Sequence, residues 1–426
     1  MRNSGSIVVV LFTLFSVGCA DRPAPFPSDT LHLGLWRMSL DIRGAHDPQA
    51  LILPFLFDLR KDGVGWQMTI HNGQESIVVE DIVIAHDTIK IRLPLFDSEF
   101  KGILKNDSTF SGYWHNYLKG PDYKIPFVAN ATSRSRFAAA QDDHLNVSGE
   151  WEAHFELGTP DAYSALGIFK ENGGLVSGTF ATETGDYRYL EGSTMGDSMF
   201  LSCFDGSHAF LFHAALSNDT LHGRFWSGTH SQEPFVAWRH AGYKLRDQDS
   251  LTFLKEGHDM VDFKFPSIDG DTVSPMDAHH AGKVMMVQVM GSWCPNCVDE
   301  TRLLQEMYSQ YHEQGLDVIA VAFERYEGQD KAIAALKHFR DELGVKYDIL
   351  FAGEASKDVA SEKLPFLSHV MSYPTCIFID RAGKVRRIRT GFYGPGTGEH
   401  YLDYKRNLQL FLEKMLAEQP AAKKAA

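Results

Sequence analysis

The chain lacks a basic surplus, and it lacks any long apolar run. Its 426 residues include 41 Lys and Arg against 55 Asp and Glu, which gives a formal net charge of −14 at pH 7. That balance excludes nucleic-acid binding through a basic surface and attachment to anionic lipid by charge alone. The apolar run at residues 7–17 is too short to span a bilayer as a helix, and no other segment of the sequence is long enough.

Cysteine is also scarce: the chain has five, and Cys294 and Cys297 form its single Cys-x-x-Cys pair. The pair follows an apolar strand expected at residues 284–290 and opens a helix whose apolar residues recur every three or four positions from Leu303 to Tyr311. At a helix N-terminus the free N–H groups and the helix dipole favour a thiolate. The pattern therefore predicts a redox-active dithiol, with Cys294 as nucleophile and Cys297 as resolving thiol.

The lack of a second Cys-x-x-Cys pair argues against a zinc site. The nearest additional ligands, His279 and His280, are adjacent in an expected loop, so we expect no metal and no cofactor. A permanent structural disulfide is disfavoured because a two-residue spacing at a helix start gives a readily reduced bond. The single cysteines Cys203 and Cys376 lie in strand-like runs and are interpreted as inert core thiols.

From the dithiol onward, over about residues 251–418, the sequence resembles the thioredoxin fold, and specifically its TlpA/ResA-like branch of membrane-attached thiol-disulfide oxidoreductases. A second signature is Tyr373-Pro374-Thr375, followed by a strand and the turn at residues 381–384, which matches the family's cis-proline, strand and hairpin. The resemblance implies that the backbone before a cis-proline pairs with an extended client chain. The expected substrate-contacting residues are Trp293, Pro295, Tyr373, Pro374 and Thr375.

Two carboxylates are candidates for a functional role. Gln288 stands six residues before Cys294, where cytoplasmic thioredoxins carry a buried aspartate, and Glu300 stands where ResA-like members carry a glutamate near the dithiol. The resemblance implies that Glu300 acts as general acid or base on the second thiol. The alternative is a solvated glutamate that complements the helix dipole. Glu324 ends an apolar strand at the sheet edge where active sites gather, with strand capping as its alternative role.

A thiol peroxidase is the first rival function. Residues 328–347 read as an extra helix before a short strand, an insertion that TlpA-like and peroxiredoxin-like proteins share. Peroxiredoxins place a threonine three residues before the reactive cysteine, whereas this chain has Gly291 there and Trp293 beside the nucleophile. Thiol-disulfide exchange is therefore the preferred hypothesis.

The N-terminus predicts the compartment. Arg2, the apolar run and the small residues before Cys19 resemble a bacterial lipoprotein signal, which implies that Cys19 is lipidated; an ordinary cleaved signal peptide is the alternative. We therefore expect a lipid-anchored protein on the periplasmic face of the cell envelope, with the choice of inner or outer membrane left open. The expected partners are client proteins with disulfides and a membrane thiol electron donor.

Residues 31–239 contain an internal repeat of roughly 110 residues. Each half has about eight short strands separated by Asn-Gly, Gly-Asp or Asn-Asp turns, which favours a barrel or a sandwich. The repeats could bind a ligand or envelope polymer, which would make the redox domain subsidiary; this is the second rival.

The expected fold is thus multi-domain, with two antiparallel β repeats before an α/β thioredoxin-like domain. The expected segments are a signal peptide and lipidation site (1–19), a tether (20–30), the first repeat (31–130), a linker (131–145), the second repeat (146–239), a second linker (240–258), the redox domain (259–418) and a disordered tail (419–426).

Overall fold

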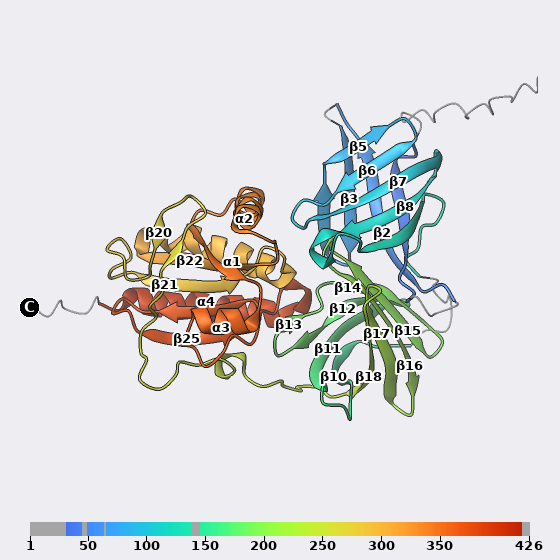
Figure 1. The fold of residues 1–426 in the computed structure, drawn as a ribbon. Coiled ribbons are helices and arrows are strands. Elements are labelled where there is room, and N and C mark those ends of the chain that lie inside the picture. The colour runs from blue at the N-terminus through green and yellow to red at the C-terminus, as the bar shows by residue number, and fades with distance from the viewer. Residues whose placement is uncertain (1–30, 45–48, 64, 138–144, 420–426) are drawn as a thin grey trace, which may run out of the picture.

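A computed structural model describes residues 31–44, 49–63, 65–137 and 145–419, and shows two curved β-sheets followed by an α/β domain (Figure 1). This arrangement confirms the expected fold class. The predicted signal peptide with Cys19, the tether and residues 420–426 lie outside the described residues. Within the described part of the chain, no helix combines the length and apolar character that crossing a membrane requires.

The first sheet has nine antiparallel strands in the order β4-β3-β2-β1-β9-β8-β7-β6-β5. Along the first strand Trp36, Met38 and Leu40 are fully buried and alternate with partly exposed residues, as expected when one sheet face covers a core. The strands are β1 (Gly34–Asp41), β2 (Ile52–Lys61), β3 (Trp66–Asn72), β4 (Glu75–Val79), β5 (Ile82–Ala85), β6 (Thr88–Arg92), β7 (Ser98–Asn106), β8 (Thr109–Asn116) and β9 (Lys124–Asn130), with the 3-10 turn η2 (Tyr117–Lys119) before the last.

The second sheet repeats this plan and closes on itself. Its order is β11-β10-β18-β17-β16-β15-β14-β12-β13, and β11 also pairs with β12, so eight strands form a closed barrel from which the short β13 extends. The strands are β10 (Gly149–Phe155), β11 (Tyr163–Asn172), β12 (Leu175–Thr182), β13 (Gly185–Asp186), β14 (Leu190–Met195), β15 (Ser198–Phe204), β16 (Ala209–Ser217), β17 (Thr220–Ser227) and β18 (Ser231–Arg239).

Matching details relate the two sheets to one another. In each sheet the first strand pairs with both the second and the last strand. The indole of Trp36 donates a hydrogen bond to the carbonyl of His32 at 3.0 Å, and the indole of Trp151 donates to that of Val147 at 2.8 Å. The repeat seen in the sequence is therefore a structural repeat, with nine strands in each sheet where about eight were expected.

The two sheets share part of their cores. Phe204, at the end of β15, is fully buried and stacks on Phe55 of the first sheet with ring centroids 4.5 Å apart. The centroid of its ring also lies 5.4 Å from that of Phe100 and 5.0 Å from that of Trp114. Aromatic contacts of this kind add to the stabilisation from burial alone, so Phe204 fastens the second sheet to the first.

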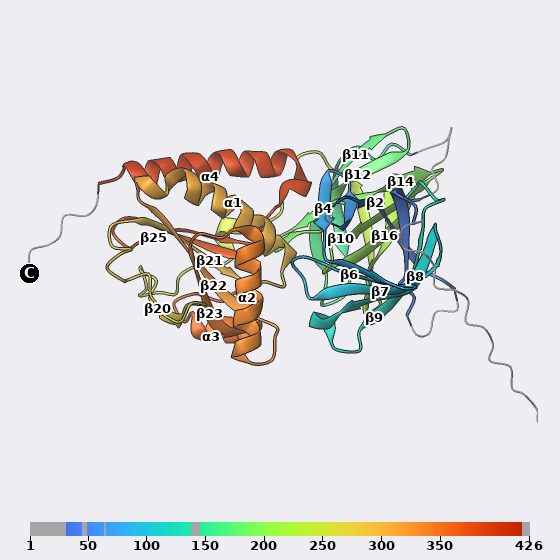
Figure 2. The same ribbon diagram turned by 90° about the horizontal axis from the view of Figure 1, so that it is seen from above.

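The C-terminal domain contains a five-stranded sheet in the order β23-β22-β21-β24-β25, in which the first three strands are parallel. Helices α1, α2 and α4 pack on one face and α3 on the other, so both faces of the central strands are covered (Figure 2). The elements are η3 (Gln248–Ser250), β19 (Phe265–Pro266), β20 (Thr272–Val273), β21 (Val284–Met290), α1 (Pro295–Tyr311), η4 (His312–Gln314), β22 (Leu316–Glu324), α2 (Gln329–Leu343), β23 (Asp348–Glu354), α3 (Lys357–Lys363), β24 (Thr375–Ile379), β25 (Val385–Thr390), η5 (Pro395–Thr397) and α4 (Glu399–Ala417).

A substitution of Phe204 tests the shared core. Phe204→Ala removes a fully buried ring and is expected to lower the free energy of unfolding of the β region by about 3 to 5 kcal/mol. Urea denaturation followed by near-ultraviolet circular dichroism measures the change. Phe253→Ala, at a side chain that is 58% exposed, is the matched control and should change little. Equal effects of the two substitutions would contradict a shared core.

Candidate functional site

The two cysteines lie where strand β21 leads into helix α1. Cys294 is the N-cap residue of α1, and its Sγ accepts a hydrogen bond from the backbone N–H of Cys297 at 3.3 Å. Cys294 is 6% exposed and Cys297 is fully buried. Burial is the main cause that raises the pKa of the Cys297 thiol well above its usual value. The sequence-predicted roles fit this asymmetry, because only the first thiol reaches a surface.

The Tyr373–Pro374 peptide bond is cis, and it faces the dithiol. The Cys294 thiol donates to the carbonyl of Tyr373 at 3.5 Å. The Thr375 side chain is fully buried and donates to the carbonyl of Ser372 at 2.8 Å, so it shapes this loop. The structure therefore brings together the two signatures that lie almost 80 residues apart in the sequence.

Glu300 lies in the core behind Cys297. It is 1% exposed, which excludes the solvated first-turn alternative. The Gln288 amide donates to Glu300 at 2.9 Å and to the carbonyl of Cys297 at 3.3 Å, and Thr301 donates to the amide oxygen of Gln288 at 3.0 Å. Burial raises the pKa of Glu300 to about 7. A carboxyl group with this pKa can exchange a proton near neutral pH.

A second buried carboxyl contacts the segment that leads into the dithiol. Glu324 is 1% exposed and accepts hydrogen bonds from both the N–H and the hydroxyl of Ser292 at 2.8 Å. Burial raises its pKa to about 7. These bonds fix the turn that carries Trp293, whose indole donates to the carbonyl of Phe323 at 2.9 Å and carries the guanidinium of Arg325 over its ring at 3.7 Å.

Arg188, in the segment between β13 and β14, connects all three parts of the molecule. It is 4% exposed, and its guanidinium contacts Glu75 of the first sheet and Asp299 of helix α1, and lies 3.6 Å from Asp205 of the second sheet. It also donates to the carbonyl of Pro295 at 3.3 Å. These carboxylates raise the pKa of Arg188 against the opposing effect of burial, so the side chain remains a cation.

The turn between β12 and β13 covers the cis-proline loop. The hydroxyl of Ser372 donates to the carbonyl of Thr184 at 2.9 Å, and the Asn296 amide donates to the carbonyl of Asp186 at 3.3 Å. A Cβ atom on Gly391 would lie 2.6 Å from the backbone of Thr184. The second sheet therefore occupies part of the surface that the sequence assigns to a client chain.

A cavity of about 770 Å³ remains where the three parts of the molecule meet, and Cys294 is part of its wall. The first sheet contributes Lys119 and Tyr123, the second contributes Tyr187, and the C-terminal domain contributes Trp293 and Arg325 among others. A volume of this size suits a small ligand or a few residues of chain.

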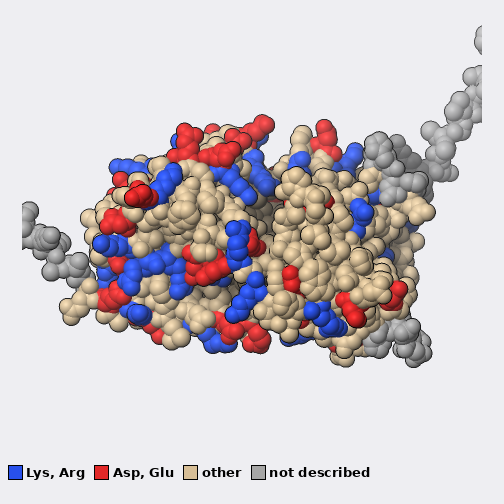
Figure 3. All heavy atoms as spheres, turned by 90° about the horizontal axis from the view of Figure 1, so that it is seen from below, with Lys and Arg blue, Asp and Glu red and all other residues tan. Residues whose placement is uncertain are grey.

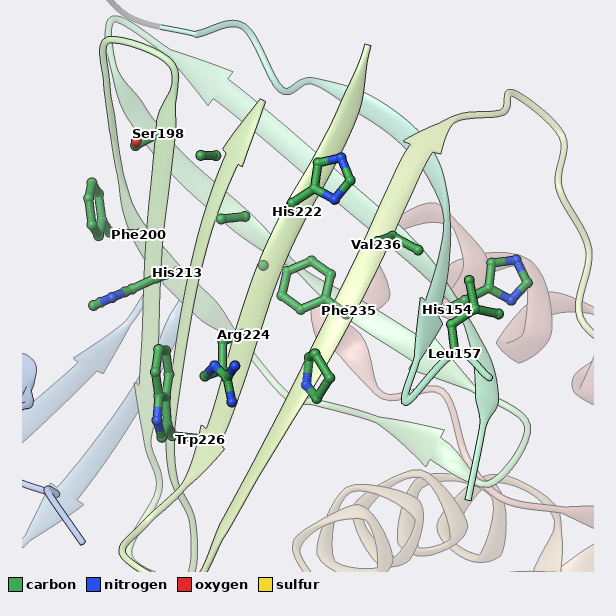
Figure 4. A pocket seen from close by; sticks show the side chains of 14 residues that line it. His154, Leu157, Ser198, Phe200, His213, His222, Arg224, Trp226, Phe235 and Val236 are labelled. Atoms are coloured by element: carbon green, nitrogen blue, oxygen red, sulfur yellow. The ribbon is translucent and has the colours of Figure 1, made fainter. Parts of the chain in front are cut away.

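A second hollow of about 620 Å³ lies over strands β15 to β18 of the second sheet (Figure 4). The labelled side chains, including His213, His222, Arg224 and Trp226, are spread along the strands and do not converge on one point. His279 and His280 lie near Asp348 at the start of β23, and His280 pairs with Asp317 at 2.9 Å. Asp317, the partner of His280, lies at the start of β22, whereas Glu324, which contacts the segment before the dithiol, lies at the end of the same strand. The structure therefore does not bring these histidines to the dithiol.

Comparisons with known proteins concern the C-terminal domain. Residues 257–388 match the model of the AhpC/TSA family. The chain is 27% identical over 150 residues to Thioredoxin-like protein YneN of Bacillus subtilis, which covers 35% of this chain and 80% of that protein. It is 26% identical over 132 residues to Thiol-disulfide oxidoreductase ResA of Bacillus anthracis, covering 31% and 68%. The C-terminal domain is a TlpA/ResA-like thioredoxin-fold domain.

Among solved structures, the chain is similar to a putative thiol:disulfide interchange protein DsbE from Chlorobium tepidum, with 23% sequence identity and a TM-score of 0.30. That match covers 39% of this chain and 100% of the other chain.

The residues that the sequence did not single out are Arg188, Asp299, Thr184 and Lys119. Arg188 and Asp299 are ordinary charged residues in the sequence, and only the fold makes them partners. A buried charge cannot be inferred from composition, because its burial depends on elements that lie more than 100 residues apart.

The pH dependence of stability tests the environment of Glu300. Its pKa is about 7 in the folded chain against 4.5 when unperturbed, so the stability contributed by its protonated form is present below pH 4.5 and is lost as the pH rises through 7. Relative to Glu300→Gln, the wild-type protein should therefore lose about 2 to 3 kcal/mol of unfolding free energy between pH 4.5 and 8. Urea titrations at several pH values measure the difference, with the exposed Glu342→Gln as control. A pH-independent difference would contradict the buried-carboxyl assignment.

Proposed function

We propose that this chain is a cell-envelope thiol-disulfide oxidoreductase that reduces disulfides through Cys294 and Cys297. The observation that carries the proposal is the geometry of the dithiol: Cys294 caps helix α1, accepts the N–H of Cys297 at 3.3 Å and lies 3.5 Å from the carbonyl of Tyr373 before the cis-proline. The activity named for the ResA relatives supports it.

The reaction starts at the exposed side of the dithiol. The Cys294 thiolate attacks one sulfur of the substrate disulfide, forms a mixed disulfide and releases the other sulfur as a thiolate. The N–H of Cys297 and the positive end of the α1 dipole stabilise the negative charge of the Cys294 thiolate before it attacks the substrate. They stabilise the same charge whenever Cys294 is the leaving group of a later exchange step. Trp293, Pro295 and Tyr373 border the cavity at this point and form the substrate contacts.

Release of the product requires a thiolate at Cys297. This thiol is fully buried, so its proton must move to an internal base. Glu300 serves as that base: it lies beside Cys297 through the shared Gln288 amide, and its pKa of about 7 lets it accept a proton at neutral pH. The Cys297 thiolate then attacks Cys294 Sγ, and the second substrate thiol leaves. Two electrons pass from the dithiol to the substrate.

The envelope location and the partners belong to the same proposal. Lipid on Cys19 would hold the chain at a membrane, and a membrane thiol electron donor would reduce the Cys294–Cys297 disulfide after each cycle.

Neither rival function has an observation of equal weight. A peroxidase threonine cannot occupy position 291, because a Cβ atom there would lie 2.2 Å from the indole nitrogen of Trp293 and 2.7 Å from the carbonyl of Phe323. For the ligand- or polymer-binding alternative, the hollow over β15 to β18 lacks convergent polar groups.

Substitution of each cysteine tests the assignment of roles. With hydroxyethyl disulfide as substrate, Cys294→Ser should abolish reduction. In Cys297→Ser, Cys294 should still attack the substrate, and a mixed disulfide on Cys294 should accumulate that mass spectrometry detects. Cys376→Ala is the matched control, because that thiol is fully buried and its burial raises its pKa well above its usual value. Full activity of Cys294→Ser, or a mixed disulfide on any other cysteine, would contradict the proposal.

A further inference from the structure

The surface next to the cis-proline is already occupied in this chain. The Thr184 carbonyl accepts the Ser372 hydroxyl, and the Asp186 carbonyl accepts the Asn296 amide, so the β12–β13 turn covers the loop that would pair with an extended client. Gly391 passes so close to Thr184 that a Cβ atom would collide with its backbone. A folded protein surface therefore cannot reach Cys294 by this side without separation of the domains.

The remaining approach to Cys294 is the cavity of about 770 Å³ between the three parts of the molecule. Aromatic rings form much of its wall: Tyr123 from the first sheet, Tyr187, Phe210 and Phe225 from the second, and Trp293 from the C-terminal domain. This volume admits a molecule of peptide or cofactor size but not a folded domain.

The cavity wall also carries two basic side chains. Lys119 and Arg325 both line the cavity and lie close enough to influence each other. Asp205 acts on Lys119 and Glu324 on Arg325 electrostatically, and among the described residues no salt bridge joins either cation to a carboxylate. Burial lowers the pKa of Lys119 to about 8, so it is mostly charged at pH 7. An anion bound in the cavity would offset the free-energy cost of burying the charged Lys119 side chain.

The carboxylates of the same cavity have partners within the protein. Glu233 accepts the hydroxyl of Tyr163 at 2.6 Å, and Asp186 accepts backbone N–H groups of Arg188 and Gly394. On the face seen in Figure 3, Lys, Arg, Asp and Glu are interspersed on the C-terminal domain, and the neighbouring β region shows fewer of them. Lys119 and Arg325 are the lysine and the arginine of the cavity lining, so they are the groups that would bind an anionic ligand there.

We propose that the substrate of this dithiol is a small, negatively charged disulfide that enters the cavity between the β-sheets and the redox domain, where Lys119 and Arg325 bind its anionic group. The inference rests on the proposed function and adds the substrate class. Cys294 forms a bond to one substrate sulfur and the first thiol leaves; Cys297 then forms the internal disulfide and the second thiol leaves, so one disulfide yields two thiols.

Three small disulfides that differ in charge test the inference with the full-length reduced protein. The probes are glutathione disulfide (anionic), hydroxyethyl disulfide (neutral) and cystamine (cationic), and the loss of protein thiols gives each rate. Each rate is divided by the rate of the same probe with dithiothreitol, which removes intrinsic reactivity. We expect glutathione disulfide to exceed cystamine by about tenfold, with the preference lost in high salt.

The variant Lys119→Met should lower the ratio of the glutathione disulfide rate to the hydroxyethyl disulfide rate about fivefold. Lys124→Met, at an exposed lysine on β9 outside the cavity, is the matched control and should leave that ratio unchanged. Equal normalised rates for the three probes, or faster reduction of insulin than of glutathione disulfide, would overturn the inference while leaving the oxidoreductase proposal intact. No reaction of any probe at Cys294 would overturn both.

Discussion

The structure depends on the buried charge of Arg188. A guanidinium removed from water is costly unless carboxylates surround it, and here they come from three different parts of the molecule: Glu75, Asp205 and Asp299. Asp299 follows Cys297 by two residues on α1, so the ion cluster holds the helix of the dithiol against both β-sheets. Loss of Arg188 would leave these buried carboxylates without their shared cation, and this makes the interface between the domains specific.

The position of the dithiol follows from that constraint. With α1 fixed, the β12–β13 turn lies over the cis-proline loop, and Cys294 is part of the wall of the cavity that residues of all three parts line. In the proposed function the β region therefore forms part of the site and restricts what reaches Cys294. Glu300 and Glu324 are two buried carboxyls whose pKa values burial raises to about 7, and in the proposed reaction Glu300 takes the proton of Cys297.

The sequence predicts the features that depend on local patterns. The Cys-x-x-Cys at a strand-to-helix junction and the Tyr373-Pro374 signature are each contained in a few residues, and the structure brings them together as expected. The repeat predicted two similar β units, but the closure of the second barrel depends on β11 pairing with β12 and is not visible in either strand alone. Arg188 could not be predicted, because its burial arises only when segments about 110 residues apart meet. The place of Lys119 could not be predicted either, because the cavity that it lines is built from three separate parts of the chain. The roles of Trp293, Pro295 and Thr375 toward a substrate stay predictions.

The most direct test of this account is the size dependence of Cys294 alkylation in the reduced protein, located by peptide mass spectrometry. If the domains enclose the nucleophile, iodoacetamide should modify Cys294 readily and a maleimide carrying a long polyethylene glycol chain should react far more slowly. The difference should shrink in Arg188→Met, which releases the interface. Equal rates of both reagents in the wild-type protein, after correction for their intrinsic reactivity, would contradict the account.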